Sequence, residues 1–551
     1  MSHRRIAASA AVLAAGISLV PAMAHAAGPA AGRAHGVTAP DMSKAAAPKS
    51  TTFSSPADRS ARQAPAAGGN KAAAAPQAAD TNPTLAVGLH ATTTTGRGLE
   101  LKADITSAPT TLSVHVDWGD NKTTNDYAAG TQTVTEAHTY DQLGTYTVKV
   151  SVTDQATQTV VSNDIVVTTE GSDYTPYGPT RLLDTRNGTG APAGKVAPYS
   201  SAHLKVGGNG GIPAGVTAVV LNVTATNTTS EGHVTAFADG DEQPKTSNLN
   251  FARYQTVPNL VIVPVGANGY VNLYNGSWES VDLVADVAGY FTHTASSGYT
   301  PMAPVRFVDT RSGLGTAKGQ VPGQGTFSTQ ISGAGGVSAG ATAVALNVTV
   351  TNPNGSGHLT VYPSGQQAPT ASNVNFTPAK TIANSVIVPV GADGRISIRN
   401  GGWDPADVIV DVVGYYSPSS ANAYLPVQPF RLLDTREWVY GPLGGRGYVH
   451  MPLASGYPHT KGFVLNTTVT NTRDRGFLSV APDPNTKEDY EKGTNTWPTT
   501  PTSSTLNWSY FDTVPNLVQT STGSTGVIDY WNQSDGDIDL VVDLFGVYTD
   551  N

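Results

Sequence analysis

The chain has 551 residues, of which 13% are charged, with a formal net charge of -9 and no cysteine. The absence of cysteine excludes a disulfide framework and a thiolate metal site. The acidic balance disfavours nucleic acid and anionic membranes as partners, because both need a basic surface. With 58 Gly, 37 Pro and no long amphipathic helical pattern, the composition favours many short strands joined by turns.

The N-terminus has the pattern of a secretory signal peptide, which we assign to residues 1–26. A basic start is followed by an apolar stretch and a small-x-small cleavage site, Ala24-His25-Ala26. Arg4-Arg5 also admits a twin-arginine signal, but the general secretion route is favoured. No second apolar run is long enough for a membrane span. The sequence therefore predicts a secreted protein that is extracellular or loosely associated with the cell wall.

Two ordered regions follow a linker. Residues 27–82 are rich in Ala, Pro, Gly and Ser and lack periodic apolar positions, so we predict a disordered linker. Beyond it, DWGD at 117–120, HTY at 138–140 and GTYTVKV at 144–150 combine a turn with alternating strands. These motifs resemble the PKD-domain family over residues 83–169, although Trp118 stands where Phe is usual. The resemblance implies an immunoglobulin-type β-sandwich.

The rest of the chain is an internal repeat with a period near 125 residues. Three motifs recur in each copy: RLLDTR, RFVDTR and RLLDTR at 181–186, 306–311 and 431–436; LNVTATN, LNVTVTN and LNTTVTN at 221–227, 346–352 and 465–471; and closing strands that begin at Asp282, Asp407 and Asp539. The period is too long for a single supersecondary unit, so each copy should be a complete domain.

Each copy contains eight to ten short apolar segments broken by turn residues. This pattern predicts an all-β chain in which three tandem antiparallel β-sandwiches of jelly-roll or Greek-key type follow the PKD-like domain. We place them at residues 174–292, 299–417 and 423–549. The connectors between them are short, which predicts separate domains with limited freedom to move relative to one another, rather than domains that share one core. The modules resemble repeats of secreted actinobacterial surface proteins, which implies an extracellular setting and says nothing of catalysis.

Recurring carboxylates and arginines admit two interpretations. The first interpretation is functional, either a carboxylate pair for acid/base chemistry or a calcium site. The other, which we favour, is a structural ion pair in which an Arg fork fixes the register of the first and last strands of each module. Asp239, Asp241 and Glu242 could also ligate calcium in a turn, but no second copy repeats them, so we expect no cofactor. The residues of the structural pairs are Asp184, Arg186, Asp286, Asp309, Arg311, Asp411, Asp434, Arg436 and Asp543.

Two tryptophans occupy matching turns. Trp278 and Trp403 each follow an Asn-Gly pair, whereas Trp531 of the third copy is displaced by four positions. A Trp at a hairpin tip could stack on a sugar ring or anchor a partner. Packing over the open end of the module is the interpretation we favour, and ligand binding is the alternative. The recurring Asn222, Asn347 and Asn466 would bridge neighbouring strands or, alternatively, bind a ligand.

These observations favour a secreted, non-catalytic interaction protein. Its repeated modules would bind an extracellular polysaccharide, a cell surface or a protein partner multivalently. The alternative is a secreted hydrolase, or a hydrolase accessory or inhibitor, with a site in one copy only. The divergent third module would then hold it, near Glu437-Trp438-Val-Tyr440 or Glu488-Asp-Tyr490-Glu-Lys492.

Overall fold

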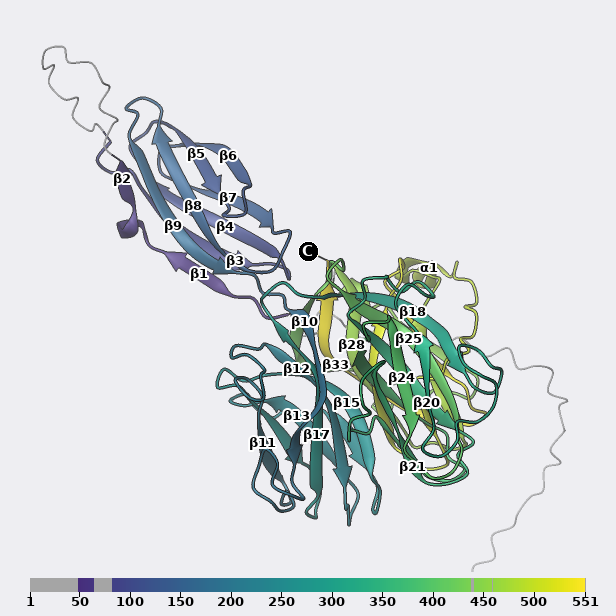
Figure 1. Ribbon diagram of the computed structural model, residues 1–551. Coiled ribbons are helices and arrows are strands. Elements are labelled where there is room, and N and C mark those ends of the chain that lie inside the picture. The colour runs from purple at the N-terminus through teal and green to yellow at the C-terminus, as the bar shows by residue number, and fades with distance from the viewer. Residues whose placement is uncertain (1–47, 64–81, 438–440, 458, 551) are drawn as a thin grey trace, which may run out of the picture. The chain divides into compact units, whose positions relative to one another are not determined.

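A computed structural model describes residues 48–63, 82–437, 441–457 and 459–550 (Figure 1). The predicted all-β class is confirmed, since strands dominate and α1 (Lys487–Lys492) is the one α-helix among these residues. The predicted signal peptide and residues 27–47 and 64–81 of the predicted linker lie outside the described residues. No helix in the described part of the chain has the length and apolar character needed to cross a membrane.

The N-terminal domain is a β-sandwich of two antiparallel sheets with the strand orders β1-β3-β4-β7 and β2-β9-β8-β5-β6. Alternating residues such as Leu112, Val114 and Val116 point into its core, as the period of two predicts. Its strands are β1 (Thr52–Ser55), β2 (Ala61–Gln63), β3 (Ala86–Thr93), β4 (Gly98–Thr106), β5 (Thr111–Asp117), β6 (Thr123–Ala129), β7 (Gln132–Thr139), β8 (Thr145–Asp154) and β9 (Val160–Thr168).

Part of the predicted linker is structured, so that prediction was wrong for residues 52–63. β1 pairs with β3 and β2 pairs with β9, each on an edge of a sheet. Edge strands carry unpaired backbone groups that an extended segment satisfies whatever its side chains are. Asn163 locks this pairing, because its buried amide donates to the carbonyl oxygens of Ser55 and Pro56.

The motif residues of this domain form one aromatic stack. The Trp118 ring is buried and lies parallel to His138 with centroids 4.6 Å apart. His138 meets the edge of Tyr140, which stacks on Tyr146 at 3.9 Å. The spacing of these residues in the sequence therefore serves packing between the two sheets.

Each of the three repeats is an eight-stranded jelly roll, which confirms the predicted sandwich class. In the first repeat the sheets have the orders β10-β17-β12-β15 and β11-β16-β13-β14, and the other repeats follow the same orders. The strands of the first repeat are β10 (Asp173–Asp184), β11 (Ser200–Lys205), β12 (Ala218–Thr226), β13 (Gly232–Ala238), β14 (Leu249–Phe251), β15 (Val257–Pro264), β16 (Tyr270–Asn275) and β17 (Asp282–Thr292).

The other two repeats reproduce this topology strand for strand. The second contains β18 (Gly298–Asp309), β19 (Thr326–Gln330), β20 (Ala343–Thr351), β21 (Gly357–Pro363), β22 (Val374–Phe376), β23 (Ile382–Pro389), β24 (Arg395–Asn400) and β25 (Asp407–Ser417). The third contains β26 (Ala423–Asp434), β27 (Tyr448–Met451), β28 (Thr460–Thr470), β29 (Gly476–Pro482), β30 (Leu506–Trp508), β31 (Val514–Ser521), β32 (Ile528–Asn532) and β33 (Asp539–Thr549).

A shared core joins the three repeats, so the expectation of separate beads was wrong. Each repeat keeps its own core between its two sheets, and a further buried cluster takes side chains from all three. Its aromatic contacts close a cycle: Tyr174 packs on Tyr416 at 4.2 Å, Tyr299 on Tyr548 at 4.3 Å and Tyr424 on Phe291 at 4.6 Å. The short connectors hold the repeats together instead of spacing them.

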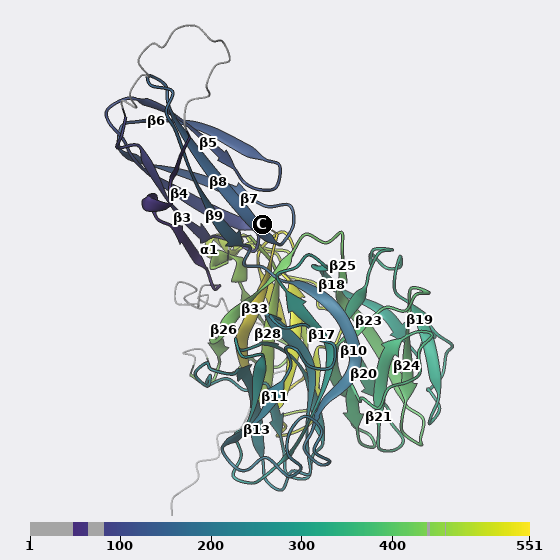
Figure 2. The same cartoon turned by 60° about the vertical axis from the view of Figure 1, so that its left-hand side comes forward.

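Backbone and side-chain hydrogen bonds repeat the same cyclic order. The segments just before β10, β18 and β26 (Figure 2) form antiparallel bridges between neighbouring repeats, Ser172 with Tyr424, Ser297 with Tyr174 and Asn422 with Tyr299. Deeper in the body, each recurring Asn donates to a backbone carbonyl of the next repeat: Asn222 to Ser372, Asn347 to Ser504 and Asn466 to Ser247. These asparagines bridge repeats rather than neighbouring strands of one sheet.

Candidate functional site

The loops that follow the first, third, fifth and seventh strands of every repeat lie at one end of its sandwich. In the first repeat these are residues 185–199, 227–231, 252–256 and 276–281. The first strands of all repeats begin at the bridges between repeats and run away from them, so these loop ends share one side of the three-repeat body. We call this side the loop face. It displays several exposed large side chains of the repeats, which are Tyr199, Tyr254, Trp278, Trp403, Tyr510 and Phe511.

An arginine fork joins the first and last strands of each repeat. Arg181 lies opposite Asp286 in the β10–β17 pairing, and its Nε and Nη2 donate to the two carboxylate oxygens at 2.9 and 3.1 Å. The fork belongs to the first Arg of the motif, which sequence analysis passed over. The same forks join Arg306 to Asp411 and Arg431 to Asp543.

The second Arg of the motif closes a local turn instead. Arg186 donates through Nε and Nη2 to Asp184 at 2.8 and 2.6 Å, as Arg311 does to Asp309 and Arg436 to Asp434. The hydrogen bond from Arg186 lowers the pKa of Asp184. The predicted pairing of Arg186 with the last strand is therefore wrong, because the chain turns back two residues after Asp184 and brings Arg186 onto that carboxylate.

Burial and arginine act in opposite directions on the last-strand carboxyls. Burial raises the pKa of Asp411 and Asp543, and the Arg forks partly offset it. All these carboxylates accept hydrogen bonds from arginine, which suits a structural pair better than general acid/base work. Asp239, considered above for calcium, accepts from the amides of Asn268 and Asn272. Among the described residues, no group of three or more His, Asp or Glu is placed to hold a metal ion.

The tryptophan turns are built on a buried asparagine. Asn275 donates to the carbonyl oxygens of Val196, Ala197 and Glu279 and accepts from Ser277. Asn400 and Asn532 hold the equivalent turns. The base of each turn is therefore fixed while its tip points outward.

The tips differ between repeats. Trp278 is 77% exposed and Trp403 is 85% exposed, so the favoured prediction that they pack over the end of the sandwich was wrong. Trp278 meets Tyr199 edge-on at 5.4 Å. In the third repeat Asp535 occupies the tip and pairs with Arg446 at 2.8 Å. The same rigid turn thus presents an indole in two repeats and a carboxylate in one.

Trp531, the third tryptophan predicted to bind a ligand, does not belong to this surface. It lies on β32, is 3% exposed and stacks on Tyr448 at 4.5 Å. The longer loop between β29 and β30 covers it. Sequence alignment of the turn showed the displacement of this Trp but not the covering loop.

The third repeat also holds a buried polar cluster under that loop. Asp483, Asp529 and His450 are each less than 5% exposed, and Tyr490 donates to Asp483 at 2.5 Å. Of the residues singled out for this repeat, Tyr490 joins the cluster, whereas Glu488 and Lys492 lie exposed on α1. Residues 438–440 lie outside the described residues.

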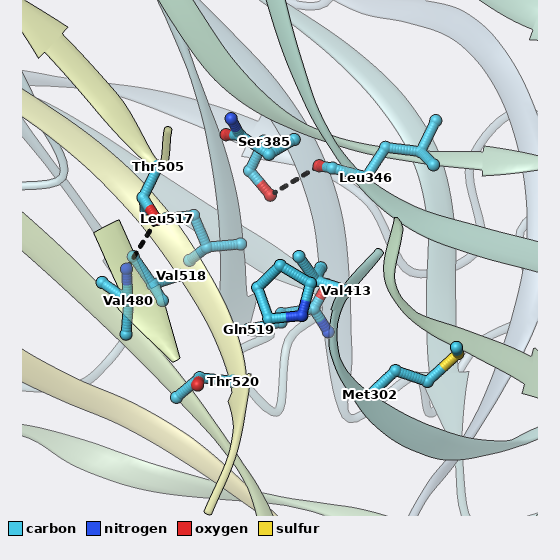
Figure 3. Close-up of a pocket in the computed structure, with 12 residues that line it drawn as sticks. Met302, Leu346, Ser385, Val413, Val480, Thr505, Leu517, Val518, Gln519 and Thr520 are labelled. Carbon is cyan, nitrogen blue, oxygen red and sulfur yellow. Dashed lines mark hydrogen bonds between the residues drawn. The ribbon is translucent and has the colours of Figure 1, made fainter. Parts of the chain in front are cut away.

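Two hollows lie among the described residues of the repeats. The gap between the second and third repeats is lined by Leu346, Ser385 and Gln519 (Figure 3) and has a volume of about 20 Å³. Such a space holds one water molecule at most. An open cleft of about 300 Å³ lies on the loop end of the third repeat, beside Arg473 and Phe511.

Comparisons with known proteins give no family. No family model matches the chain and no curated protein matches it. Among solved structures, the chain is similar to a carbohydrate-binding module of the β-sandwich superfamily, with 12% identity over 59% of this chain and 93% of that chain and a TM-score of 0.13. It is also similar to α-L-rhamnosidase of Streptomyces avermitilis complexed with L-rhamnose, with 10% identity over 81% of this chain and a TM-score of 0.14. The chain spans 55% of that enzyme. Similarity at this level carries no functional argument.

Proposed function

We propose that this chain is an exported, non-catalytic protein that binds an extracellular glycan polymer through the loop face. The observation that carries the proposal is the pair of indoles, Trp278 and Trp403, displayed at equivalent tips on fixed turns. Exposing a large apolar ring to water costs free energy, and two repeats do so at the same position. A flat ring on a rigid support suits stacking on the face of a sugar.

The turn is the same in all three repeats, but the residue displayed at its tip changes, and this difference favours a role in recognition. All three repeats keep the buried asparagine of the turn, but the tip carries Trp278, Trp403 or Asp535. A purely structural turn would place no demand for an indole on its solvent side. A different residue at the tip is expected if each repeat contacts a different part of one ligand.

The shared core makes the three loop ends one rigid unit. Weak sites fixed in space engage a repeating polymer together, and the second contact then forms at a high effective concentration. Separate beads would lose this advantage to the entropy of their connectors. The N-terminal sandwich, which resembles the PKD family, would serve as a spacer in this arrangement, and the predicted signal peptide would export the protein.

The test is a pull-down of the mature protein on insoluble chitin, cellulose and peptidoglycan. We expect retention on at least one polymer, reduced about tenfold or more by the double variant Trp278→Ala/Trp403→Ala, since each stacking contact contributes about 1 kcal/mol. Tyr127→Ala is the matched control, because Tyr127 is 71% exposed on the N-terminal sandwich. Retention unchanged in the double variant would refute the proposal, as would turnover of the polymer by the wild-type protein.

A further inference from the structure

The third repeat differs from the others by a covering segment over its outer sheet. The loop between the fourth and fifth strands runs over residues 239–248 and 364–373 in the first two repeats but over 483–505 in the third. Residues 483–497, here called the cover, include α1 and lie over β27 and β32. They hide a sheet face that the other repeats leave open.

Aromatic contacts hold the cover to that face. Tyr490 of the cover stacks on His450 with centroids 3.5 Å apart. Trp497 meets Tyr448 at 5.0 Å and Trp531 at 6.0 Å, in both cases edge-on. Trp497 contacts the sheet on one side and is 51% exposed, so at this point a single layer of side chains separates the sheet face from solvent.

A pair of carboxyl groups joins the cover to the sheet. In the first repeat, the amide of Asn272 donates to Asp239 at 2.8 Å. At the same register in the third repeat, Asp529 replaces the amide and faces Asp483. A carboxylate cannot donate a hydrogen bond, so this pair must hold a proton to make the contact that the amide makes elsewhere. Burial raises the pKa of Asp529, and the neighbouring Asp483 raises it further.

Within the described part of the chain, no cation compensates this pair. The titratable groups that face it are His450 and Tyr448 on β27 and Tyr490 on α1. Burial lowers the pKa of His450, which keeps the imidazole neutral, and raises the pKa of Tyr490 and Tyr448. Neither Lys nor Arg contributes to the pKa shift of Asp529 among the described residues.

The hidden face carries buried polar atoms whose hydrogen bonding is incomplete while the cover is closed. His450 Nδ1, Asp529 Oδ1 and Trp531 Nε1 are buried without a hydrogen bond of normal geometry. Such atoms are costly in a closed interior and useful in a binding site. With the cover removed, two aromatic rings, an imidazole and a carboxyl group would face solvent together, which is the chemistry that recognises the ring faces and hydroxyl groups of a sugar.

We propose that the outer sheet face of the third repeat is a second carbohydrate-binding face, closed by the cover and opened when the carboxyl pair loses its shared proton. This deepens the glycan-binding function proposed above but uses none of its residues. Because the folded-state pKa of Asp529 lies above its ordinary value, the contact is fully present in acid and is lost as the pH rises toward that folded-state pKa.

Hydrogen exchange of the full-length protein tests the opening. After correction for intrinsic rates, cover amides should exchange about tenfold faster for each pH unit gained between the ordinary carboxyl pKa and the raised folded-state pKa of Asp529. Asp529→Asn restores the amide donor of the first repeat and should keep the cover protected at every pH. Asp535→Asn, a change of an exposed carboxylate in the same repeat, should behave as wild type. If cover amides showed the same pH dependence of exchange in wild type and Asp529→Asn, the carboxyl pair would not control opening of the cover, and the proposal would be overturned.

Binding of soluble chitin, cellulose and xylan oligosaccharides tests the face itself, in a Trp278→Ala/Trp403→Ala background so that the loop face makes no contribution. Replacing residues 484–502 by residues 240–245 of the first repeat removes the cover but keeps the following strand. This variant should bind at about pH 6 and about pH 9, and the parent only at the higher pH. Absence of binding by a folded cover-less variant would overturn the binding face, whatever the loop-face pull-down had shown.

Discussion

Asn222, Asn347 and Asn466 form a closed ring of hydrogen bonds between the three repeats. Removing one of these asparagines should destabilise all three repeats together. Asn347 donates to the carbonyl of Ser504 and accepts from the amide of Asn516 at 3.1 Å, both in the third repeat. Asn347→Ala removes the partner of the Ser504 carbonyl and one of the two hydrogen bonds of the Asn516 amide, in an interface where Asn516 is fully buried. Each of these lost hydrogen bonds costs about 1–3 kcal/mol, so the expected loss is about 2–4 kcal/mol.

Equilibrium unfolding in urea, followed by far-UV circular dichroism, measures this loss. Asn354→Ala is the control, because Asn354 is an exposed residue of the same repeat, and it should change stability by less than about 0.5 kcal/mol. Asn222→Ala and Asn466→Ala break the equivalent bonds and should give losses similar to that of Asn347→Ala. If all three variants unfold like the control, the repeats do not depend on this ring and the shared core is not a unit of stability.

Other contacts give expectations of the same kind. A Cβ added at Gly414 would lie 2.1 Å from the Tyr299 hydroxyl, so Gly414→Ala should cost about 1–3 kcal/mol in urea unfolding. A Cβ at Gly340 would meet nothing closer than the Ser417 hydroxyl at 3.7 Å, an ordinary contact, so Gly340→Ala should be neutral. Arg181→Ala should cost about 3–5 kcal/mol by the same assay, because it leaves the buried Asp286 carboxylate unpaired; a smaller loss than that of Arg186→Ala would contradict the fork. The first Asp of each repeat motif has a lowered pKa, so its contribution is present above the ordinary carboxyl pKa and lost as the pH falls, and unfolding midpoints should drop between about pH 5 and pH 2.

The jelly-roll architecture could be predicted because turn residues and strand periodicity are local signals. The repeat copies also located the first and last strands of each module, since their motifs meet in the β10–β17 pairing. The roles within those motifs needed the structure. Two arginines in one six-residue motif have the same local pattern, and only the turn after Asp184 decides that Arg186 folds back while Arg181 crosses to Asp286.

The sequence of β12 contains an indication of the core shared by the three repeats that the sequence analysis did not use. Every residue of Ala218–Thr226 is buried, with Val219, Leu221 and Val223 in the core of the repeat and Ala218 and Val220 in the shared core. A strand with one face in water alternates apolar and polar residues, and this strand does not. The pattern could have indicated cover on both faces, but it could not identify the other two repeats as that cover.

The recurring glycine of the closing strands has a similar explanation. A Cβ at Gly289 would lie 2.1 Å from the ring of Tyr174, which lies across it and donates to the Ala288 carbonyl at 2.7 Å. Tyr174 stands more than a hundred residues earlier in the chain, so sequence distance hid the partner. The carboxyl pair of the third repeat was hidden for the same reason, because Asp483 and Asp529 meet only after the sheet has formed.

The cyclic order of the asparagine hydrogen bonds limits the number of repeats that such a protein can contain. The third repeat donates back to the first, so no donor and no acceptor of the ring is left over for another copy. An open array of modules can lengthen by duplication, but an inserted fourth copy here would have to break the closure. Copies can therefore diverge in what their loops display, while their number stays at three.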